Sequence, residues 1–389
     1  MTRSAPALDD RRIEALMDGA LALAERGGGG TAPNPMVGCV LCDADGQILG
    51  EGFHARAGEA HAEVLALEDA RAAGHDVHGA TAVVTLEPCA HPGKTPPCAE
   101  TMARAGIGRV VYAMADPHVG RGGAVHLEAA GIPVRGGVRE RMARRLNEPW
   151  LHFIATGRPF FHLKTAQTLN ARVTRGREDE RWVTGVAARA AVHRLRRRHA
   201  AVLVGIGTVQ ADDPLLTVRE WPPAGSERTG DPPWPDVQPV RVILDSRLGI
   251  PLSSRLIESA RSIPVWIFCG SETSEERSAE LAARGAEIVR VPHLPAGLDL
   301  EAVSHELVSR GVTGVLVEPG PTLATAFLES GFVDRWTMFL APDWVAARGA
   351  LPLLLSEAPH TGFVLDEAEW EVHDSDAAVS GRVRRATPR

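Results

Sequence analysis

Four residues in the first third of the chain have the types and spacing needed to hold a metal ion and to move a proton. His61 and Glu63 lie two positions apart, and Cys89 and Cys98 flank the eight residues AHPGKTPP. One imidazole and two thiolates leave the fourth position of a tetrahedral zinc ion open for a water, whose pKa falls to about 7. We expect Glu63 to carry a proton from that water to a leaving amino group rather than to bind the metal. The spacing therefore predicts a catalytic zinc site for hydrolytic deamination.

The same residues match the signature of zinc deaminases, which is His-x-Glu followed by Pro-Cys and a second Cys. Cys98 also begins an expected helix, where the N-terminal dipole favours a thiolate. The signature's short spacing between the cysteines is replaced here by eight residues. With this longer loop, the stretches NPMVG (34–38), GFHARAGEAHAE (52–63) and EPCAHPGKTPPC (87–98) resemble the deaminase half of the bifunctional riboflavin-biosynthesis deaminase/reductase family.

The resemblance implies four substrate contacts in the deaminase half. Asn34 and His54 correspond to contacts with the pyrimidine, and His91 and Lys94 to contacts with the ribose phosphate. A carboxamide can donate to and accept from a base edge, and a lysine is a compact charge suited to phosphate. The alternatives are structural: Asn34 could begin a turn before proline, His54 could be a surface histidine, and Lys94 could be exposed and idle.

The second half of the chain resembles the reductase partner of the same family, which has a fold like dihydrofolate reductase and uses NADPH. The matching stretches are WVTG (182–185), VLVGIGTVQADDPLLTVR (202–219), RVILDS (241–246) and VEPGPTLATAFLESGFVD (317–334). The turn that opens the last expected helix has free N–H groups able to hold a pyrophosphate. By this resemblance the cofactor contacts are Trp182, Thr208, Asp212, Ser246, Gly320, Pro321 and Thr322, and the substrate contacts are Lys164, Thr168, Arg196, Leu216, Arg219 and Glu318.

Several positions depart from the family pattern. In LKTAQTLNARVT (163–174) the family's Ser, Asp and Gly are replaced by Thr168, Asn170 and Ala171. Ala171 restores a side chain where glycine would serve a positive φ or a close cofactor approach. Glu180 stands where the family commonly has a substrate-contacting serine, and His118 replaces an asparagine in ADPHVGRGG (115–123). The changes at 168, 170, 171 and 180 predict either a weakened reductase or a changed substrate, whereas His118 puts in doubt only the contacts made by its own loop.

The composition narrows the class of protein. The chain has 389 residues, 44% hydrophobic and 23% charged, which suits two globular domains. A net charge of −7 disfavours a nucleic-acid binder, and no apolar run is long enough for a membrane span. The N-terminal segment reads as an amphipathic helix rather than a signal peptide, and the 5 cysteines indicate thiols in the cytoplasm more than disulfides.

The order of expected elements gives the domains. Helices near 10–26, 62–73, 98–106 and 124–131 alternate with strands near 36–43, 47–54, 80–86, 108–116 and 132–137. Strands near 201–207, 239–246, 265–270, 287–292, 314–320 and 336–342 predict a mostly parallel sheet in the second half. We therefore expect a cytidine-deaminase-like three-layer α/β domain at 8–152 and a dihydrofolate-reductase-like α/β domain at 158–383. The arginine-rich run 194–198 is expected to be mostly surface charge.

Four hypotheses follow. The leading one is a bifunctional riboflavin-pathway enzyme that deaminates 2,5-diamino-6-(5-phosphoribosylamino)pyrimidin-4-one at zinc and then reduces the ribosyl chain with NADPH, and the family implies a homo-oligomer. The second keeps the deaminase but has an impaired or repurposed reductase, in a specialised pathway that branches from the same pyrimidine. The third is a nucleic-acid deaminase, which the negative charge opposes. The fourth is a structural zinc closed by Cys39 or Cys42, which instead fit a buried strand.

Overall fold

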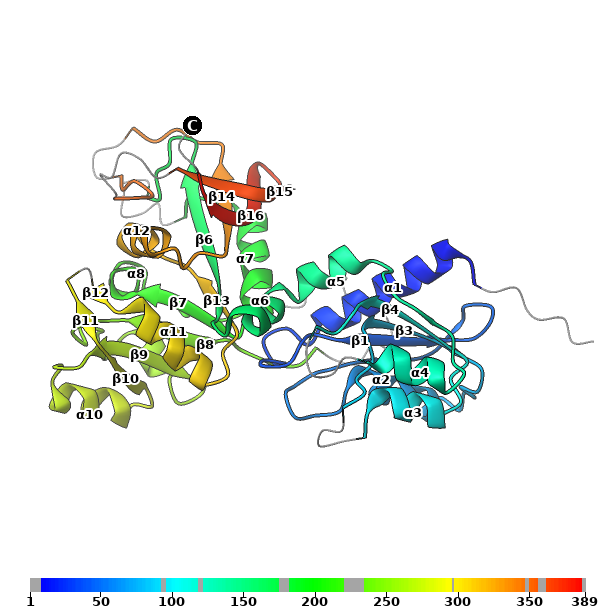
Figure 1. Ribbon diagram of the computed structural model, residues 1–389. Coiled ribbons are helices and arrows are strands. Elements are labelled where there is room, and N and C mark those ends of the chain that lie inside the picture. The colour runs from blue at the N-terminus through cyan, green and yellow to red at the C-terminus, as the bar shows by residue number, and fades with distance from the viewer. Residues whose placement is uncertain are drawn as a thin grey trace, which may run out of the picture. The chain divides into compact units, whose positions relative to one another are not determined.

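The structure is a computed structural model that describes residues 8–91, 96–117, 122–174, 182–219, 234–295, 297–346, 350–355 and 362–386. Its contacts divide the chain into two compact units. The first is formed by Met1–Gly157 with Pro232–Asp236, and the second by Arg158–Asp231 with Val237–Arg389. Each unit is built on one large sheet, so both halves have the α/β class predicted from the sequence (Figure 1).

The first unit contains a 5-stranded sheet in the order β2-β1-β3-β4-β5. Strands β1 and β2 are antiparallel, β1 and β3 are antiparallel, and β3, β4 and β5 run parallel. The strands are β1 (Gly38–Cys42), β2 (Ile48–Phe53), β3 (Thr81–Leu86), β4 (Arg109–Met114) and β5 (Val134–Arg135). The tight connection of β1 to β2 passes through Gly46, whose φ of 79° only glycine adopts freely.

Helices cover both faces of this sheet, which gives the expected three layers (Figure 1). On one face lie α1 (Asp10–Glu25), α5 (Glu140–Leu146) and α6 (Glu148–Thr156), and on the other α2 (Ala62–Ala72), α3 (Cys98–Arg104) and α4 (Gly123–Ala129). In β1 the side chains alternate between the two cores, with Val40 facing α1 and Leu41 facing α2. Cys39 and Cys42 are fully buried in this strand, as predicted.

The second unit contains a 9-stranded sheet in the order β10-β9-β8-β7-β13-β6-β14-β16-β15. All neighbours from β10 to β14 are parallel, and the last two pairings, β14 with β16 and β16 with β15, are antiparallel. The strands are β6 (Phe160–Thr168), β7 (Ala201–Gly205), β8 (Val240–Leu244), β9 (Val265–Gly270), β10 (Glu287–Val291), β13 (Gly314–Val317), β14 (Arg335–Ala341), β15 (Phe363–His373) and β16 (Asp376–Arg385), with a separate pair β11 (His293–Leu294) and β12 (Gly297–Leu298).

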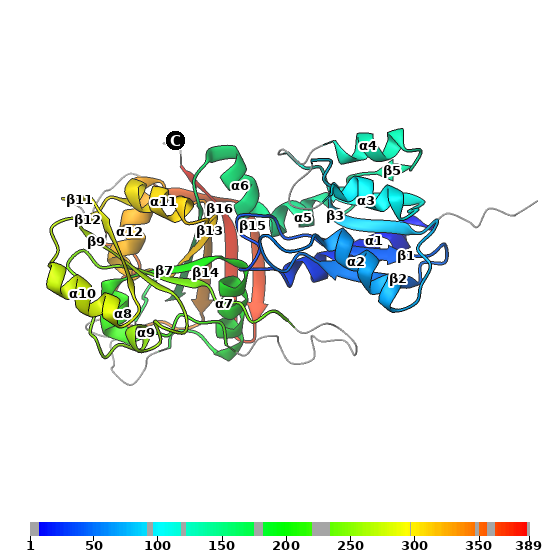
Figure 2. The same ribbon diagram turned by 90° about the horizontal axis from the view of Figure 1, so that it is seen from below.

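Helices cover both faces of the large sheet (Figure 2), and a buried cluster lies on each face. One packs β-strand residues such as Leu203 against α11 (Leu300–Ser309) and α12 (Pro321–Ser330), and the other packs Val202 against α8 (Ile206–Asp212), α9 (Arg255–Glu258) and α10 (Glu275–Ala283). Helix α7 (Val186–Arg198) packs against Phe339 of β14. Since the strands between are parallel, their carboxyl ends share one edge, where ligands of such sheets bind.

The predicted strands of both halves are present, and five further strands were not predicted: β6, β11, β12, β15 and β16. Polar residues interrupt the apolar run of β6, and β11 and β12 have two residues each. It was wrong about the arginine run, because only Arg194 is exposed there. Arg197 is 2% exposed, and Arg196 forms an ion pair with Glu318. Among the described residues, no helix is both long and apolar enough to cross a membrane.

Candidate functional site

The predicted zinc ligands lie together at one edge of the first sheet. His61 is the residue before α2, Cys89 follows β3, and Cys98 is the first residue of α3. One ligand atom from each lies within 4.8 Å of the others, and His61 Nδ1 is 3.2 Å from Cys98 Sγ and 3.8 Å from Cys89 Sγ. A histidine nitrogen and two sulfurs at these separations fit the first shell of one zinc ion. The residues present therefore suit the metal that the sequence predicts.

The two thiols are electrostatically unequal. Hydrogen bonding from the Cys98 thiol, with further bonds from His61 and from the Cys98 backbone N–H, lowers the pKa of Cys89 to about 4. The shared proton, together with burial, raises the pKa of Cys98. Hydrogen bonding to Cys89 also raises the pKa of His61. Because metal ligands must be deprotonated, binding of a zinc ion would release protons from this cluster.

Glu63 lies in the first turn of α2, two residues after the ligand His61, and its side chain is buried (4% exposed). Burial raises the pKa of its carboxyl group, and the neighbouring His61 opposes that effect. A carboxyl group with a raised pKa can exchange a proton near neutral pH, which is what a general acid and base must do. The structure thus brings the predicted base to the predicted ligands.

Asn34 and His54 are in direct contact. Asn34 Nδ2 lies 3.2 Å from His54 Nε2, and His54 Nδ1 lies 3.0 Å from the carbonyl oxygen of Ala60. Burial lowers the pKa of His54, which favours the uncharged ring. Its one proton then lies on Nδ1, and Nε2 accepts from the Asn34 amide. His54 also packs edge-on against His61, with ring centroids 5.6 Å apart, so this pair borders the ligand cluster.

Glu87, which directly follows β3, joins the loop after this strand to the start of α4. Its buried carboxylate accepts hydrogen bonds from the backbone N–H groups of Asp116, Gly122 and Ala124. A Cβ added at Gly123 would meet the carbonyl oxygen of Pro88 at 1.7 Å, so α4 begins directly against the segment that carries Cys89. Glu87 therefore fixes the position of the loop that follows β3.

The two predicted phosphate contacts of this half, His91 and Lys94, lie at and beyond the end of the described segment 8–91. His91 is exposed, two residues after Cys89. Lys94 and His118, which replaces the family's asparagine, lie outside the described residues.

Most of the predicted reductase residues follow the carboxyl ends of parallel strands. Lys164 and Thr168 lie on β6, Ser246 follows β8, and Glu318 and the Gly320 turn follow β13. Gly320 precedes α12, with Pro321 and Thr322 as its first residues. A Cβ added at Gly320 would lie 3.4 Å from Thr208 Oγ1, so two of the predicted cofactor segments touch.

The remaining cofactor candidates are more dispersed. Asp212 is exposed at the end of α8, and Thr322 is exposed on α12. Trp182 is 55% exposed, with the guanidinium of Arg189 5.1 Å from its ring.

A buried charged cluster occupies the same edge of the sheet. Arg196 holds Glu318 through two hydrogen bonds of 2.5 and 2.9 Å and donates a third to the carbonyl oxygen of Thr217. Burial acts to raise the pKa of Glu318, but the charge and hydrogen bonds of Arg196 outweigh it and lower the pKa to about 2. Burial lowers the pKa of Lys164, against the attraction of Glu318. The Arg196 side chain therefore fixes Glu318 rather than standing open toward a ligand.

The loop after α8 presents backbone rather than apolar side chains. Leu216 has a φ of 56° and is 2% exposed, with its side chain in the core. Gln238 accepts from Val218 N–H at 2.8 Å and donates to Val218 C=O at 3.2 Å. The Arg219 guanidinium bonds to Thr217 Oγ1 and is exposed. Gln238 was not predicted, and its bonds hold the segment that carries two of the predicted substrate contacts.

The departures from the family pattern at 168–171 lie at the end of β6 and in the ordered turn that follows it. Ala171 has a φ of 56°, the conformation for which the family's glycine is suited. Asn170 Oδ1 accepts from Thr168 Oγ1 at 2.8 Å and from Val345 N–H at 3.2 Å, and Asn170 Nδ2 donates to Val345 C=O at 2.8 Å. The turn is thus accommodated by contacts that an asparagine can make. Glu180 lies outside the described residues.

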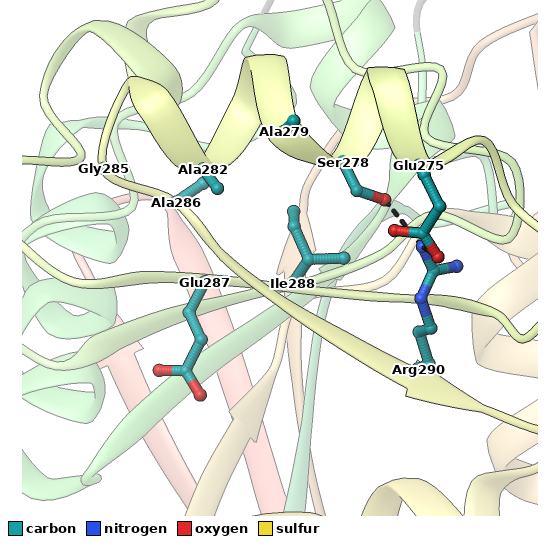
Figure 3. Close-up of a pocket in the computed structure, with 9 residues that line it drawn as sticks. All are labelled: Glu275, Ser278, Ala279, Ala282, Gly285, Ala286, Glu287, Ile288 and Arg290. Carbon is teal, nitrogen blue, oxygen red and sulfur yellow. Dashed lines mark hydrogen bonds and ion pairs between the residues drawn. The ribbon is translucent and has the colours of Figure 1, made fainter.

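A hollow of about 800 Å³ lies elsewhere, between α10 and β10 (Figure 3). At one end Arg290 pairs with Glu275 at 2.9 Å and donates to Ser278 Oγ at 3.0 Å. Alanine and glycine form much of the remaining lining. None of the predicted site residues lies in it, so the hollow is not the candidate site.

Comparisons with known proteins match both halves. The family model "Cytidine and deoxycytidylate deaminase zinc-binding region" matches residues 10–114, and "RibD C-terminal domain" matches residues 159–378. Riboflavin biosynthesis protein RibD of Escherichia coli is 39% identical over 362 residues, which are 90% of this chain and 95% of that protein. The protein of the same name from Aquifex aeolicus is 39% identical over 83% of this chain and 85% of its own length.

Solved structures agree. RibD of Acinetobacter baumannii is 35% identical with a TM-score of 0.76, covering 97% of this chain and 100% of that one. A Thermotoga maritima diaminohydroxyphosphoribosylaminopyrimidine deaminase/5-amino-6-(5-phosphoribosylamino)uracil reductase is 33% identical with a TM-score of 0.76, covering 97% of this chain and 99% of that one.

Proposed function

Because this chain belongs to the RibD family, in which a zinc deaminase is fused to an NADPH-dependent reductase, we propose that it catalyses two consecutive steps on one phosphoribosylated pyrimidine. Water first replaces the 2-amino group of 2,5-diamino-6-(5-phosphoribosylamino)pyrimidin-4-one, with release of ammonia. NADPH then donates a hydride, with a proton, that reduces the ribosyl chain to a ribityl chain. The observation that carries the proposal is the grouping of His61, Cys89 and Cys98 beside the buried Glu63.

In the deaminase half we assign the three ligand residues to zinc. When bound there, zinc would supply a Lewis acid that lowers the pKa of a water molecule. Glu63 takes a proton from the attacking water and delivers it to the departing amino group, a transfer that its raised pKa favours. Asn34, oriented by neutral His54, offers its amide to the pyrimidine edge. His91 and Lys94 are assigned to the ribose phosphate.

In the reductase half the chemistry belongs to the cofactor, and the protein aligns the reactants. The Gly320–Thr322 turn, Thr208, Asp212, Ser246 and Trp182 are assigned to NADPH. The turn precedes a helix whose N–H groups suit a phosphate.

Lys164, Thr168 and Glu318 are assigned to substrate, together with the Leu216–Arg219 segment. Arg196 serves the substrate by holding Glu318 in place, through the paired hydrogen bonds between them.

We also propose that the chain acts as a homo-oligomer in the cytoplasm. Strand β15 is an edge strand of 11 residues, and Trp370 and Val372 on it are 67% and 80% exposed. A long exposed edge strand has backbone groups that can pair with another chain, and a second copy would cover this one. All five cysteines are free, which suits a reducing compartment. Sedimentation of the wild type against Trp370→Glu tests the assembly: a smaller species for the variant supports it, and equal masses oppose it.

One assay tests the two activities together. Zinc-loaded protein is given the diaminopyrimidine phosphoriboside, first without and then with NADPH. Ammonia release in the first stage and NADPH oxidation in the second are expected. Ammonia release with no NADPH oxidation would refute the bifunctional assignment, and no ammonia release would refute the deaminase substrate.

A further inference from the structure

Asn147 makes an unusual pair of contacts in the first unit. Its Oδ1 accepts from the backbone N–H of Met36 at 2.7 Å, and its Nδ2 donates to the backbone C=O of Met36 at 2.9 Å. The side chain is 1% exposed. We propose that Asn147 is a positioning residue of the deaminase site, which holds the segment carrying Asn34 in place for the substrate.

The Asn147 side chain starts from a fixed backbone. Its own N–H donates to Ala143 C=O at 3.0 Å, and its own C=O accepts from Leu151 N–H at 2.9 Å. The residue therefore ends α5 and begins α6, with Pro149 in the first turn of the second helix. With both helices packed on the sheet, the carboxamide has little freedom except to face Met36.

Met36 needs this partner because the sheet ends beside it. The pairing of β1 with β3 begins at Cys39 and Val84, and the N–H of Gly38 donates to Thr85 Oγ1 instead of to a strand. Met36 lies two residues further out and is 6% exposed. Its N–H and C=O are buried polar groups that require partners, and the carboxamide supplies one of each, as a neighbouring strand would.

The contacts continue from Met36 to the substrate side. Two residues before it, Asn34 donates to His54, whose ring is fixed by Ala60 C=O and lies against the ligand His61. A shift of Met36 would move the Asn34 amide relative to the ligand cluster. The inference rests on the proposed deaminase function, since it concerns where Asn34 meets the pyrimidine.

The test is Asn147→Leu, which keeps the side-chain size and removes both hydrogen bonds. Arg144→Ala, an exposed change on α5, is the matched control for a disturbed helix. We expect kcat/KM for ammonia release to fall about 10-fold to 100-fold, mainly through KM, because a shift of about 1 Å in a substrate-positioning group can cost about that factor. Zinc content and NADPH oxidation should stay at the wild-type level. Loss of zinc, a parallel fall in both activities, or no change would overturn the proposal.

A double-mutant cycle separates positioning from general destabilisation. If Asn147 acts through Asn34, then Asn147→Leu should change kcat/KM by less than about twofold in an Asn34→Ala background, because non-additivity marks residues that act together. An equal loss in both backgrounds would show that the two residues act independently and would overturn the proposal.

A readout without substrate keeps this test distinct from the proposed function. If the wild type releases no ammonia from the diaminopyrimidine, the proposed substrate is wrong. The clamp, meaning the two hydrogen bonds of Asn147 to Met36, is then tested by hydrogen exchange of the peptide that contains Met36. Exchange at least about 10-fold faster in Asn147→Leu than in the wild type and in Arg144→Ala supports the clamp. Unchanged protection overturns it.

Discussion

The two halves of this chain organise their sites differently. In the deaminase half the predicted residues contact one another, with three ligand atoms within 4.8 Å and Asn34 bonded to His54. In the reductase half most of the predicted residues lie near the ends of β6, β7, β8 and β13, and the contacts among them include the Arg196–Glu318 pair and the approach of Gly320 to Thr208.

The difference follows from which partner supplies the chemistry. A hydrolytic site must build its own ligand set and base, so side chains converge on one point. A site that borrows a hydride needs a long surface along which a cofactor and a substrate can align, and much of that surface is backbone and glycine. Contacts among side chains therefore reveal the first kind of site more readily than the second.

Removal of zinc should separate the halves most strongly. A chelator that removes zinc from His61, Cys89 and Cys98 should abolish ammonia release, because no water of lowered pKa remains. NADPH oxidation with the deaminated compound should continue at the untreated rate. Added zinc should restore ammonia release, and a parallel loss of both activities would contradict the independence of the two sites.

Glu63→Gln should have the next largest effect. The amide keeps the size of the side chain but cannot carry a proton, so kcat for ammonia release should fall about 10²-fold to 10⁴-fold. Zinc content, measured by metal analysis, should equal that of the wild type because Glu63 is not assigned as a ligand. Retained deamination would refute the assignment of the base, and reductase activity serves as the internal control.

The sequence was most informative where function depends on residue type at short spacing. His61, Glu63, Cys89 and Cys98 could be proposed from the sequence because a zinc site restricts both the residue types and the order in which they occur. Asn147 could not, because its partner Met36 lies 111 positions away and an asparagine between two helices is equally well explained as a helix boundary. A buried carboxamide is recognised only when the backbone that it pairs with is known.

The same limit applies to the second half. Strand β6 contains the polar residues Lys164, Thr165 and Gln167, so its sequence does not indicate a buried strand. In the structure it is a central strand paired with β13 and β14. The expectation that position 171 requires a positive φ was a local argument about glycine, and the φ of 56° at Ala171 agrees with it. Asn170 departs from the family's aspartate, but its amide bonds to both backbone groups of Val345, which no pattern in the sequence indicates.

The buried pair of the reductase half should give a smaller effect that depends on pH. The folded-state pKa of Glu318 is about 2, below its ordinary 4.5, so its contribution to stability is complete above pH 4.5 and is lost as the pH falls toward 2. Between pH 7 and pH 3.5 the wild type should therefore lose about 1 kcal/mol more unfolding free energy than Glu318→Gln, which cannot titrate there. Urea unfolding followed by tryptophan fluorescence reports mainly this half, since only two of the eight tryptophans, Trp150 and Trp234, belong to the first unit. Identical pH dependence of the two proteins would contradict the ion pair.

The smallest expected effect is on the unfolding free energy when Ala171, in the turn after β6, is replaced by glycine. Two opposing contributions decide its sign. Ala171→Gly relieves a left-handed conformation that costs a residue with a Cβ about 1 to 2 kcal/mol. Glycine also raises the conformational entropy of the unfolded chain, which returns part of that gain. We therefore expect a net stabilisation of about 0.5 to 1 kcal/mol in the same urea assay.

Ala279→Gly is the matched control for this substitution, because it makes the same chemical change at an exposed position of α10. There no strain is relieved, and glycine should destabilise the helix by about 1 kcal/mol. Opposite signs for the two variants, with NADPH oxidation unchanged within twofold, would show that Ala171 is a tolerated cost in an otherwise intact reductase. A loss of stability in Ala171→Gly would show that the Cβ makes a compensating contact, and the departure at position 171 would then belong to the architecture of the site that distinguishes this half from the deaminase.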